Sequence, residues 1–260
     1  MKKIIFITLI LIVFASCRDE KIITENTEDI QNIQSYISKN PSLQLSDNLI
    51  ACAGSSVSEL LDSSSSQNVS ILFLPIKSST DFTYFEMNND FFPKEDFANY
   101  FEKDTKSLPL FNGFLRRFTQ NTLSNDYWSR VTFLTDDSLH ICNAIRIKQF
   151  SKPTIVANDI IEISLTEPNK PLFNWESDTE EENFIYFQVI SDAENNVISA
   201  TYTYEKYFQF YDLSNVILNV YDVTSPELKA TERYNFTLMG ISEDNWVNLI
   251  AEKSFSSLTN

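Results

Sequence analysis

The sequence contains little glycine, histidine and cysteine and few basic residues, and each shortage excludes a class of function. Only three glycines occur among the 260 residues (Gly54, Gly113 and Gly240), so the chain has no glycine-rich loop to hold a phosphate or dinucleotide. A single histidine, His140, excludes most nucleophile–base arrangements and most zinc sites. Twenty basic residues against thirty-six acidic ones give a formal charge of −16, which disfavours nucleic acid as a partner. We therefore predict a non-enzymatic protein without a metal or cofactor.

The chain is nevertheless apolar enough to fold. Hydrophobic residues make up 43% of it and aromatic residues 13%, which excludes a disordered polyanion because so much apolar surface can offset the loss of chain entropy. The length allows one large domain or two ordinary ones, since domains cluster around 100–150 residues.

The N-terminus has the pattern of a secretory signal. Met1-Lys2-Lys3 is followed by an apolar run over residues 4–14, which is shorter than the roughly 20 residues that span a bilayer but fits a signal-peptide core. Phe14-Ala15-Ser16-Cys17 resembles the bacterial lipoprotein box, which implies that residues 1–16 are removed and that Cys17 is lipidated. The alternative is an ordinary signal peptide cut near Ala15.

The three residues after Cys17 extend this resemblance. Arg18-Asp19-Glu20 is similar to the export signal of surface lipoproteins of the Bacteroidetes, in which one basic and two acidic residues follow the lipidated cysteine. The resemblance implies an outer-membrane lipoprotein at the cell surface, and the alternative is anchoring on the periplasmic face.

The rest of the chain predicts a β protein. We expect residues 17–46 to form a tether with one short helix, capped by Thr27 and followed by Pro41. From residue 47 the apolar residues recur with a period of two, and turn residues interrupt them at short intervals, which is typical of antiparallel sandwiches. Residues 151–154 contain Pro153 and separate two strand series, so we predict one sandwich over 47–150 and a second over 155–260.

The second series resembles a fibronectin type III domain. Pro171-Leu172-Phe173-Asn174-Trp175 is similar to the second strand of that family, and Leu228 with Tyr234 matches its leucine–tyrosine spacing. The resemblance implies that Trp175, Leu228 and Tyr234 belong to the core and that the tyrosine hydroxyl bonds back to the preceding corner. The first series resembles the same family more weakly, through Trp128 and the strand around it. We expect tandem fibronectin III/Ig-like sandwiches, as in uncharacterised two-domain lipoproteins of Flavobacteria.

Side-chain alternation makes further predictions. In the run 139–148 the odd positions are mostly apolar, so the sequence places His140 and Cys142 on the solvent face, whereas Cys52 lies in a segment apolar on both faces. This pattern therefore disfavours a disulfide between the two cysteines, although an oxidising envelope would permit it.

Surface aromatic residues are the candidates for ligand binding. Sorted by parity, residues 202–211 place Tyr202, Tyr204, Phe208 and Phe210 on one face and present Tyr207 and Tyr211 on the other. Trp246 lies on a loop tip or begins the last strand. The sequence thus predicts a binding or scaffolding module whose partner is a polysaccharide or an envelope protein complex. A glycan-binding accessory using the tyrosines, and a hydrolase of unrecognised type, are the alternatives.

Overall fold

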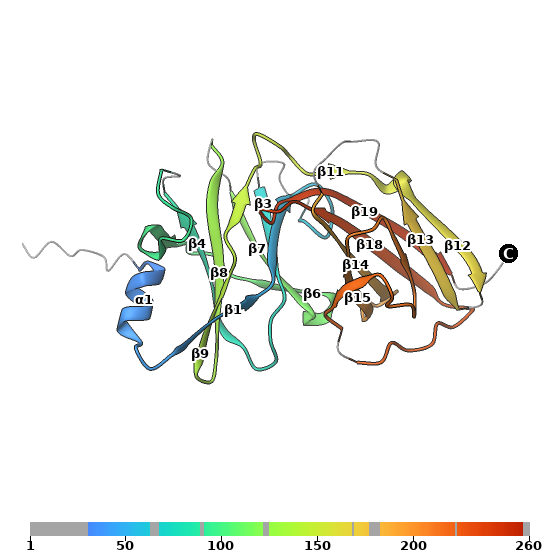
Figure 1. Ribbon diagram of the computed structural model, residues 1–260, viewed down its shortest axis with the longest axis horizontal. Coiled ribbons are helices and arrows are strands. Elements are labelled where there is room, and N and C mark those ends of the chain that lie inside the picture. Colours follow the sequence, from blue (N-terminus) through green and yellow to red (C-terminus); the bar gives the residue numbers. More distant parts are fainter. Residues whose placement is uncertain are drawn as a thin grey trace, which may run out of the picture. The chain divides into compact units, whose positions relative to one another are not determined.

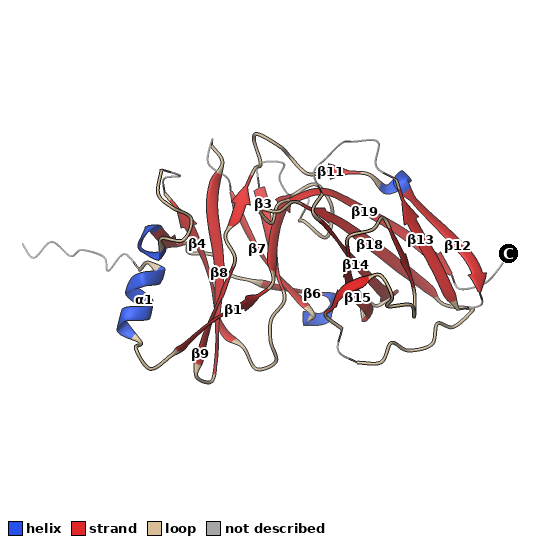
Figure 2. Ribbon diagram, viewed as in Figure 1, coloured by secondary structure: helices blue, strands red, loops and turns tan. Residues whose placement is uncertain are grey.

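The chain folds almost entirely into β-strands. The computed structural model describes residues 31–62, 68–88, 91–121, 125–167, 169–176, 183–221 and 223–256, and these belong to one compact unit, Gln31–Asn260. Strands dominate this unit, and the helical segments are few and short (Figure 2). The all-β prediction is confirmed.

The strands form two series, preceded by the helix α1 (Ile33–Lys39). The first series contains β1 (Gln44–Leu49), β2 (Ala51–Ser55), β3 (Asn68–Phe73), β4 (Thr80–Met87), β5 (Tyr100–Glu102), β6 (Leu108–Leu110), β7 (Leu115–Asn121), β8 (Tyr127–Thr135), β9 (Ser138–Cys142) and β10 (Ile145–Ile147). The second contains β11 (Ile155–Val156), β12 (Ile161–Glu167), β13 (Lys170–Trp175), β14 (Ile185–Asp192), β15 (Val197–Thr203), β16 (Tyr207–Gln209), β17 (Val216–Asn219), β18 (Arg233–Ile241) and β19 (Val247–Ser256). Single 3-10 turns lie at η1 (Phe97–Asn99), η2 (Phe111–Gly113) and η3 (Asn158–Ile160).

The first series closes into a sandwich of two sheets. One sheet has the strand order β2-β3-β7-β6, and the other has the order β1-β9-β8-β4-β5, with β10 also paired to β8. Val69, Ile71 and Phe73 alternate along β3 and point into the core between the sheets, where Val131 and Phe133 of β8 meet them. The period of two in the sequence therefore produces this core.

The second series forms a sandwich with the features that the fibronectin type III resemblance implies. A sheet β12-β13-β16 faces a sheet β11-β19-β18-β14-β15-β17. Trp175, Leu228 and Tyr234 are all buried in the core between them. The Tyr234 hydroxyl accepts a hydrogen bond of 2.8 Å from the backbone N–H of Lys229, which is the bond back to the preceding corner that the tyrosine spacing predicts.

The two sandwiches also pack on each other, so four sheets lie in layers (Figure 1). Cys52 and Leu72 point out of the first sandwich and meet Phe187 and Met239, which point out of the second. This contact requires strands that are apolar on both faces, and β3 is such a strand because Leu72 is buried as completely as its neighbours Ile71 and Phe73.

Helix α1 covers the far face of the first sandwich. Asn32 caps the helix, since its side-chain oxygen accepts a hydrogen bond of 2.7 Å from the backbone N–H of Ser35. Ile33 is buried against a cluster that includes Leu139 and Ile141 of β9. A helix was predicted in this region; its predicted cap, Thr27, lies outside the described residues, and the observed cap is five residues further along.

The helix explains why the prediction for β9 was wrong. Leu139 and Ile141 are buried, but they pack against α1 and not in the core between the two sheets. His140 and Cys142 point toward the opposite sheet and are buried as well. The His140 ring stacks on Phe133 with 4.8 Å between ring centroids. Burial lowers the pKa of His140. Neither residue is exposed to solvent, because both faces of β9 are covered.

The cysteines Cys52 and Cys142 are both buried free thiols. Cys142 lies in the core of the first sandwich, where its sulfur accepts a hydrogen bond of 3.0 Å from the backbone N–H of Val131. Cys52 lies in the cluster between the sandwiches. Burial raises the pKa of Cys52 to about 12 and that of Cys142 to about 11.

The segment 202–211 is not one strand. The chain leaves β15 at Thr203, turns over residues 204–206 and enters β16 in the opposite sheet. Tyr202 therefore lies between the sandwiches, Phe208 and Phe210 lie in the second core, and Tyr204 is 54% exposed. The parity prediction that placed these four residues on one face is wrong, because the turn resets the alternation.

Candidate functional site

The residues predicted for lipidation and export cannot be placed in this fold. Cys17, Arg18, Asp19 and Glu20 all lie outside the described residues. Among the helices of the described ranges, none is long and apolar enough to cross a membrane.

Trp246, a predicted candidate for ligand binding, is completely buried. It belongs to the turn 242–246 between β18 and β19 of the second sandwich, which we call the junction turn, yet its ring lies in the core of the first sandwich. Its indole N–H donates a hydrogen bond of 2.7 Å to the carbonyl of Lys152. The ring is therefore not accessible to a ligand, and instead joins the two sandwiches.

Backbone hydrogen bonds hold the junction turn in place. The Ala53 N–H donates to the Asn245 carbonyl at 3.0 Å, and the Arg146 N–H donates to the Asp244 carbonyl at 2.9 Å. The Asp244 carboxylate also forms an ion pair with Lys148. The junction turn thus contacts β2 and the β10 end of the first sandwich at once.

The predicted linker, residues 151–154, takes part in the same contact. Thr154 is buried, and its hydroxyl accepts from the Ser55 N–H at 2.8 Å and donates to the Val247 carbonyl at 2.7 Å. Gly54 permits this close approach, since a Cβ at that position would come within 3.0 Å of the Thr154 hydroxyl. Thr154, in the connection between the sandwiches, is therefore hydrogen-bonded to both of them, through Ser55 of the first and Val247 of the second.

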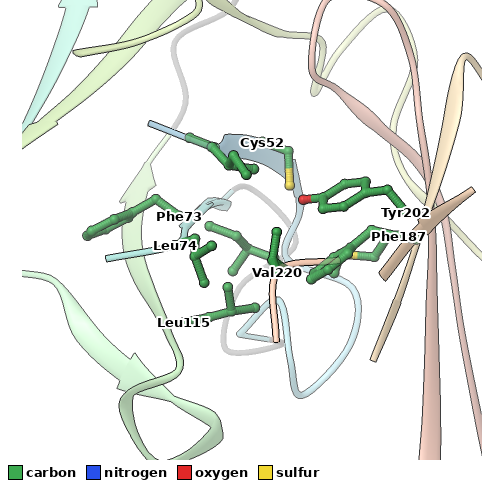
Figure 3. Close-up of a pocket in the computed structure, with 11 residues that line it drawn as sticks. Cys52, Phe73, Leu74, Leu115, Phe187, Tyr202 and Val220 are labelled. Carbon is green, nitrogen blue, oxygen red and sulfur yellow. The ribbon is translucent and has the colours of Figure 1, made fainter. Parts of the chain in front are cut away.

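A small cavity lies in the apolar layer between the sandwiches (Figure 3). The Tyr202 hydroxyl and the Cys52 sulfur point toward one another across it, and Leu115 and Val220 line its other side. Its volume is about 10 Å³, which is room for one water molecule at most. This cavity is a packing gap and not a ligand site.

A much larger groove of about 630 Å³ runs between the sandwiches beside the junction turn. One wall comes from the first sandwich and includes the end of β1, the start of β2, Lys94 and Glu95. The other wall comes from the second sandwich and contains Phe184, Ile217 and Leu218, which are 53%, 44% and 44% exposed. The groove therefore has one polar wall and one wall with accessible apolar side chains.

Acidic side chains outnumber basic ones along the groove. Four carboxylates line it (Asp47, Glu95, Glu243 and Asp244), against the two cations Lys94 and Arg130. Arg130 is itself buried, where its guanidinium lies over the rings of Phe97 and Tyr100 and donates to the Lys94 carbonyl. The accessible charge of the groove is therefore mainly negative.

Trp128, predicted as a core residue, lies on the outer face of the first sandwich near this groove. It is half-buried, and Lys94 and Arg146 each lie 5.2 Å from its ring centroid. These cation–π contacts hold Lys94 at the edge of the groove. Trp128 differs in this respect from Trp175, which occupies the core between two sheets.

Strand β17 forms the rim of the apolar wall. It is the last strand of its sheet, where it pairs with β15. No strand among the described residues pairs with its other side. The groove thus lies next to a sheet edge whose backbone is accessible.

The predicted ligand-binding tyrosines are exposed but belong to a different surface. Tyr207 lies on the edge strand β16 and is 40% exposed, and Tyr211 lies in the following turn and is 41% exposed. The Tyr211 hydroxyl donates to the Ser225 carbonyl at 3.2 Å. Neither tyrosine lines the groove. Since Tyr211 follows β16 and has a φ of 71°, the strand spacing assumed for the pair does not apply.

Titratable groups do not gather at the groove in a catalytic arrangement. The His140 ring nitrogens are 2.9 Å from the Thr135 hydroxyl and 3.0 Å from the Asn48 side-chain oxygen, which makes it part of the core hydrogen bonding. Among the described residues, no three His, Cys, Asp or Glu side chains are close enough together to hold a metal ion. The groove offers apolar contacts, carboxylates and backbone groups, which are features suited to binding.

Sequence reasoning missed the groove because neither sandwich contains it alone. It arises where two sandwiches dock, so its residues come from distant parts of the chain. One signal was present: the uncharged run from Leu213 to Tyr221 is flanked by Asp212 and Asp222 in an otherwise highly charged protein.

The chain resembles several solved structures at low sequence identity. No protein-family model and no curated protein matches the chain. Among solved structures, the FN1–FN3 domains of chicken CNTN1 have 12% identity and a TM-score of 0.32, over 84% of this chain and 68% of that one. A cytokine receptor complex has 7% identity and a TM-score of 0.29, over 74% and 92%. The glycoside hydrolase domain of Endo-D from Streptococcus pneumoniae has 7% identity and a TM-score of 0.32, over 80% and 33%. Superpositions at this level carry no functional argument, and the architecture rests on the strand pairing described above.

Proposed function

We propose that this protein is a non-enzymatic lipoprotein that binds a partner at the bacterial outer membrane through the groove between its two sandwiches. The observation that carries the proposal is the groove of about 630 Å³ with exposed Phe184, Ile217 and Leu218 on one wall. Exposed apolar side chains gathered beside a concave surface are typical of an interaction site. The N-terminal pattern that ends at Cys17 supports the lipid anchor.

Metabolic labelling with a palmitate analogue tests the anchor. We expect the wild type to take up the label and Cys17→Ala to lose it, because only a thiol at this position can carry the diacylglycerol. Surface proteolysis of intact cells then distinguishes the cell surface from the periplasmic face. Equal labelling of both proteins, or a wild type free of lipid, would contradict the anchor.

Site-specific photocrosslinking in intact cells tests the groove. A photoreactive amino acid at Phe184 should form adducts with a partner, whereas the same group at Phe150 should not. The two positions form a matched pair because their exposures are 53% and 54%, but only Phe184 lines the groove. Adducts from Phe150 alone, or from neither position, would place the binding surface elsewhere or remove it.

Polysaccharide binding through Tyr207 and Tyr211 is the second candidate, because both rings are about 40% exposed and tyrosine rings stack on sugars. Replacing both with alanine should abolish retention on a polysaccharide column while leaving the unfolding midpoint unchanged. Unchanged retention would exclude this candidate. Release of reducing sugar or ester hydrolysis by the purified protein would instead favour a hydrolase.

A further inference from the structure

The edge of the second sandwich at β17 lacks the protection that several other sheet edges have. Natural edge strands avoid pairing with other chains by carrying charged residues or proline. Several edge strands of this protein follow that rule: Asp47 lies in β1, Glu102 in β5, Pro109 in β6, and Glu162 and Glu167 in β12. The β17 sequence Val-Ile-Leu-Asn contains neither, and no charge occurs from Leu213 to Tyr221.

The hydrogen-bonding direction of β17 follows from one bond. The Val220 N–H donates to the Ala200 carbonyl at 3.0 Å, and Leu218 is paired with Tyr202 of β15. Because alternate residues of a regular antiparallel strand bond to the same side, the backbone groups of Asn219 point away from β15, and the register shifts at Ile217. The Asn219 groups point to the side on which no described strand lies.

The side chains on this edge are also accessible. Ile217 and Leu218 are adjacent at the point where the register of β17 shifts, each is 44% exposed and each lines the groove. A strand added beside β17 would therefore gain main-chain hydrogen bonds together with apolar contacts to these two side chains.

We propose that β17 binds an extended, basic peptide segment of a partner protein, which pairs with it as an additional strand of the sheet. This inference rests on the proposed binding function, since it names the class of partner that the same groove takes. The backbone edge selects an extended segment. The carboxylates of Asp47, Glu95 and Glu243 along the groove select positive charge on it.

The same charge argument decides against a second copy of this chain. Each copy carries a formal charge of −16, and two such chains repel each other when they approach edge to edge. We therefore expect the purified protein to be a monomer.

A synthetic peptide of four Lys-Val repeats, labelled with a fluorophore, is the probe. Fluorescence anisotropy measures its binding to the full-length protein and compares it with the same peptide carrying N-methyl groups on alternate residues. N-methylation removes backbone donors but keeps the side chains and charge. We expect at least about tenfold weaker binding of the methylated peptide, since each lost hydrogen bond weakens binding roughly two- to tenfold.

Two variants locate the site, and one serves as a control. Ile217→Pro places a proline on the edge, which disfavours pairing with another chain, and Ile217→Lys adds a charge that repels the peptide, so each should weaken binding about tenfold. Ile155→Lys is the matched control, because Ile155 is 42% exposed and lies on β11, the opposite edge of the same sheet. Its affinity should stay within about twofold of the wild type. Circular dichroism verifies that each variant folds. If Ile217→Pro does not fold, Ile217→Lys decides the result.

Equal binding of the two peptides would overturn the inference, as would equal effects of Ile217→Lys and Ile155→Lys. No binding of the unmethylated peptide would overturn it too. So would a dimer in light scattering that Ile217→Lys dissociates, because a second copy would then occupy the edge. None of these outcomes affects the crosslinking from Phe184, so a failure of strand pairing is distinguishable from a failure of the binding function.

Discussion

At the scale of single residues, Trp246 has the most unusual position. The chain supplies it from the second sandwich, but its ring is enclosed by the first. We expect Trp246→Ala to lower the free energy of unfolding by about 3–5 kcal/mol, because it leaves a large cavity in a packed core. Urea unfolding followed by circular dichroism measures this change.

Tyr207→Ala is the control for that measurement. Its ring is 40% exposed, so its removal should change the free energy of unfolding by less than about 0.5 kcal/mol. A similarly small loss for Trp246→Ala would show that the contact of the Trp246 ring with the first sandwich contributes little to stability.

The buried thiols make stability depend on alkaline pH. Burial raises the pKa of Cys52 from 9.0 to about 12 and that of Cys142 from 9.0 to about 11. Since the folded pKa values exceed the unfolded value, their contribution to stability is fully present below about pH 9 and is lost as the pH rises toward 11 and 12. The double variant Cys52→Ala/Cys142→Ala should therefore lose less stability than the wild type between pH 9 and 11.

Thiol labelling gives an independent measurement. At about pH 8 a thiol-specific reagent should modify neither cysteine of the folded protein but both cysteines in denaturant, because only an accessible thiolate reacts. Rapid labelling of the folded protein would contradict the burial of Cys52 and Cys142.

At the scale of elements, helix α1 shields the outer face of β9. Ile33 is 1% exposed and contacts the cluster that contains Leu139 and Ile141. We expect Ile33→Ala to cost about 2–4 kcal/mol of unfolding free energy, since it removes buried methyl and methylene groups. Gln34→Ala, on the exposed side of the same helix, should cost almost nothing. Thermal and urea unfolding of both variants test this, and equal effects would show that α1 is not firmly docked.

Some features of the strands could be predicted from the sequence, and others could not. The period of two predicted strands from residue 47 onward, and β8 and β18 are such strands, because alternation of apolar and polar residues depends on a strand and its immediate neighbours. Trp175 and Tyr234 were placed in the core by the resemblance to a fibronectin type III domain, and both are buried there. The alternation in 139–148 predicted the wrong face for His140 and Cys142, because a distant helix covers the other side.

The groove and its edge strand could not be predicted in this way. Their geometry depends on which faces of two sandwiches meet, and that is a long-range choice. Leu72 beside Ile71 and Phe73 indicated a strand covered on both faces, but not what covers it. The turn at 204–206 moves the chain from one sheet to the other, and which sheet the chain enters after a turn is also a long-range choice.

At the scale of the whole molecule, the two sandwiches should unfold together. The junction turn, Thr154 and the apolar layer between the sandwiches link them. Trp128 belongs to the first sandwich and Trp175 to the second. We therefore expect two variants that each keep one of these tryptophans, and in which Trp246 is replaced by Phe, to show the same urea midpoint by fluorescence.

In the two single-tryptophan variants, the further substitution Thr154→Val should separate the unfolding transition of the first sandwich from that of the second. It leaves the Ser55 N–H and the Val247 carbonyl without their buried partner, at a cost of about 1–3 kcal/mol. If the two single-tryptophan variants already have distinct urea midpoints while they still carry Thr154, the sandwiches unfold independently.

The position of Trp246 also sets an order of events during synthesis. A ribosome delivers the chain from the first residue onward at about 5–20 residues per second, and N-terminal domains ordinarily fold before later ones emerge. Here the interior of the first sandwich can be completed only after β18 has been made, because the ring of Trp246 follows that strand in the chain. We therefore expect the first sandwich to lack its full stability until then, which is the condition in which a chain can be threaded through a narrow translocation channel before it closes.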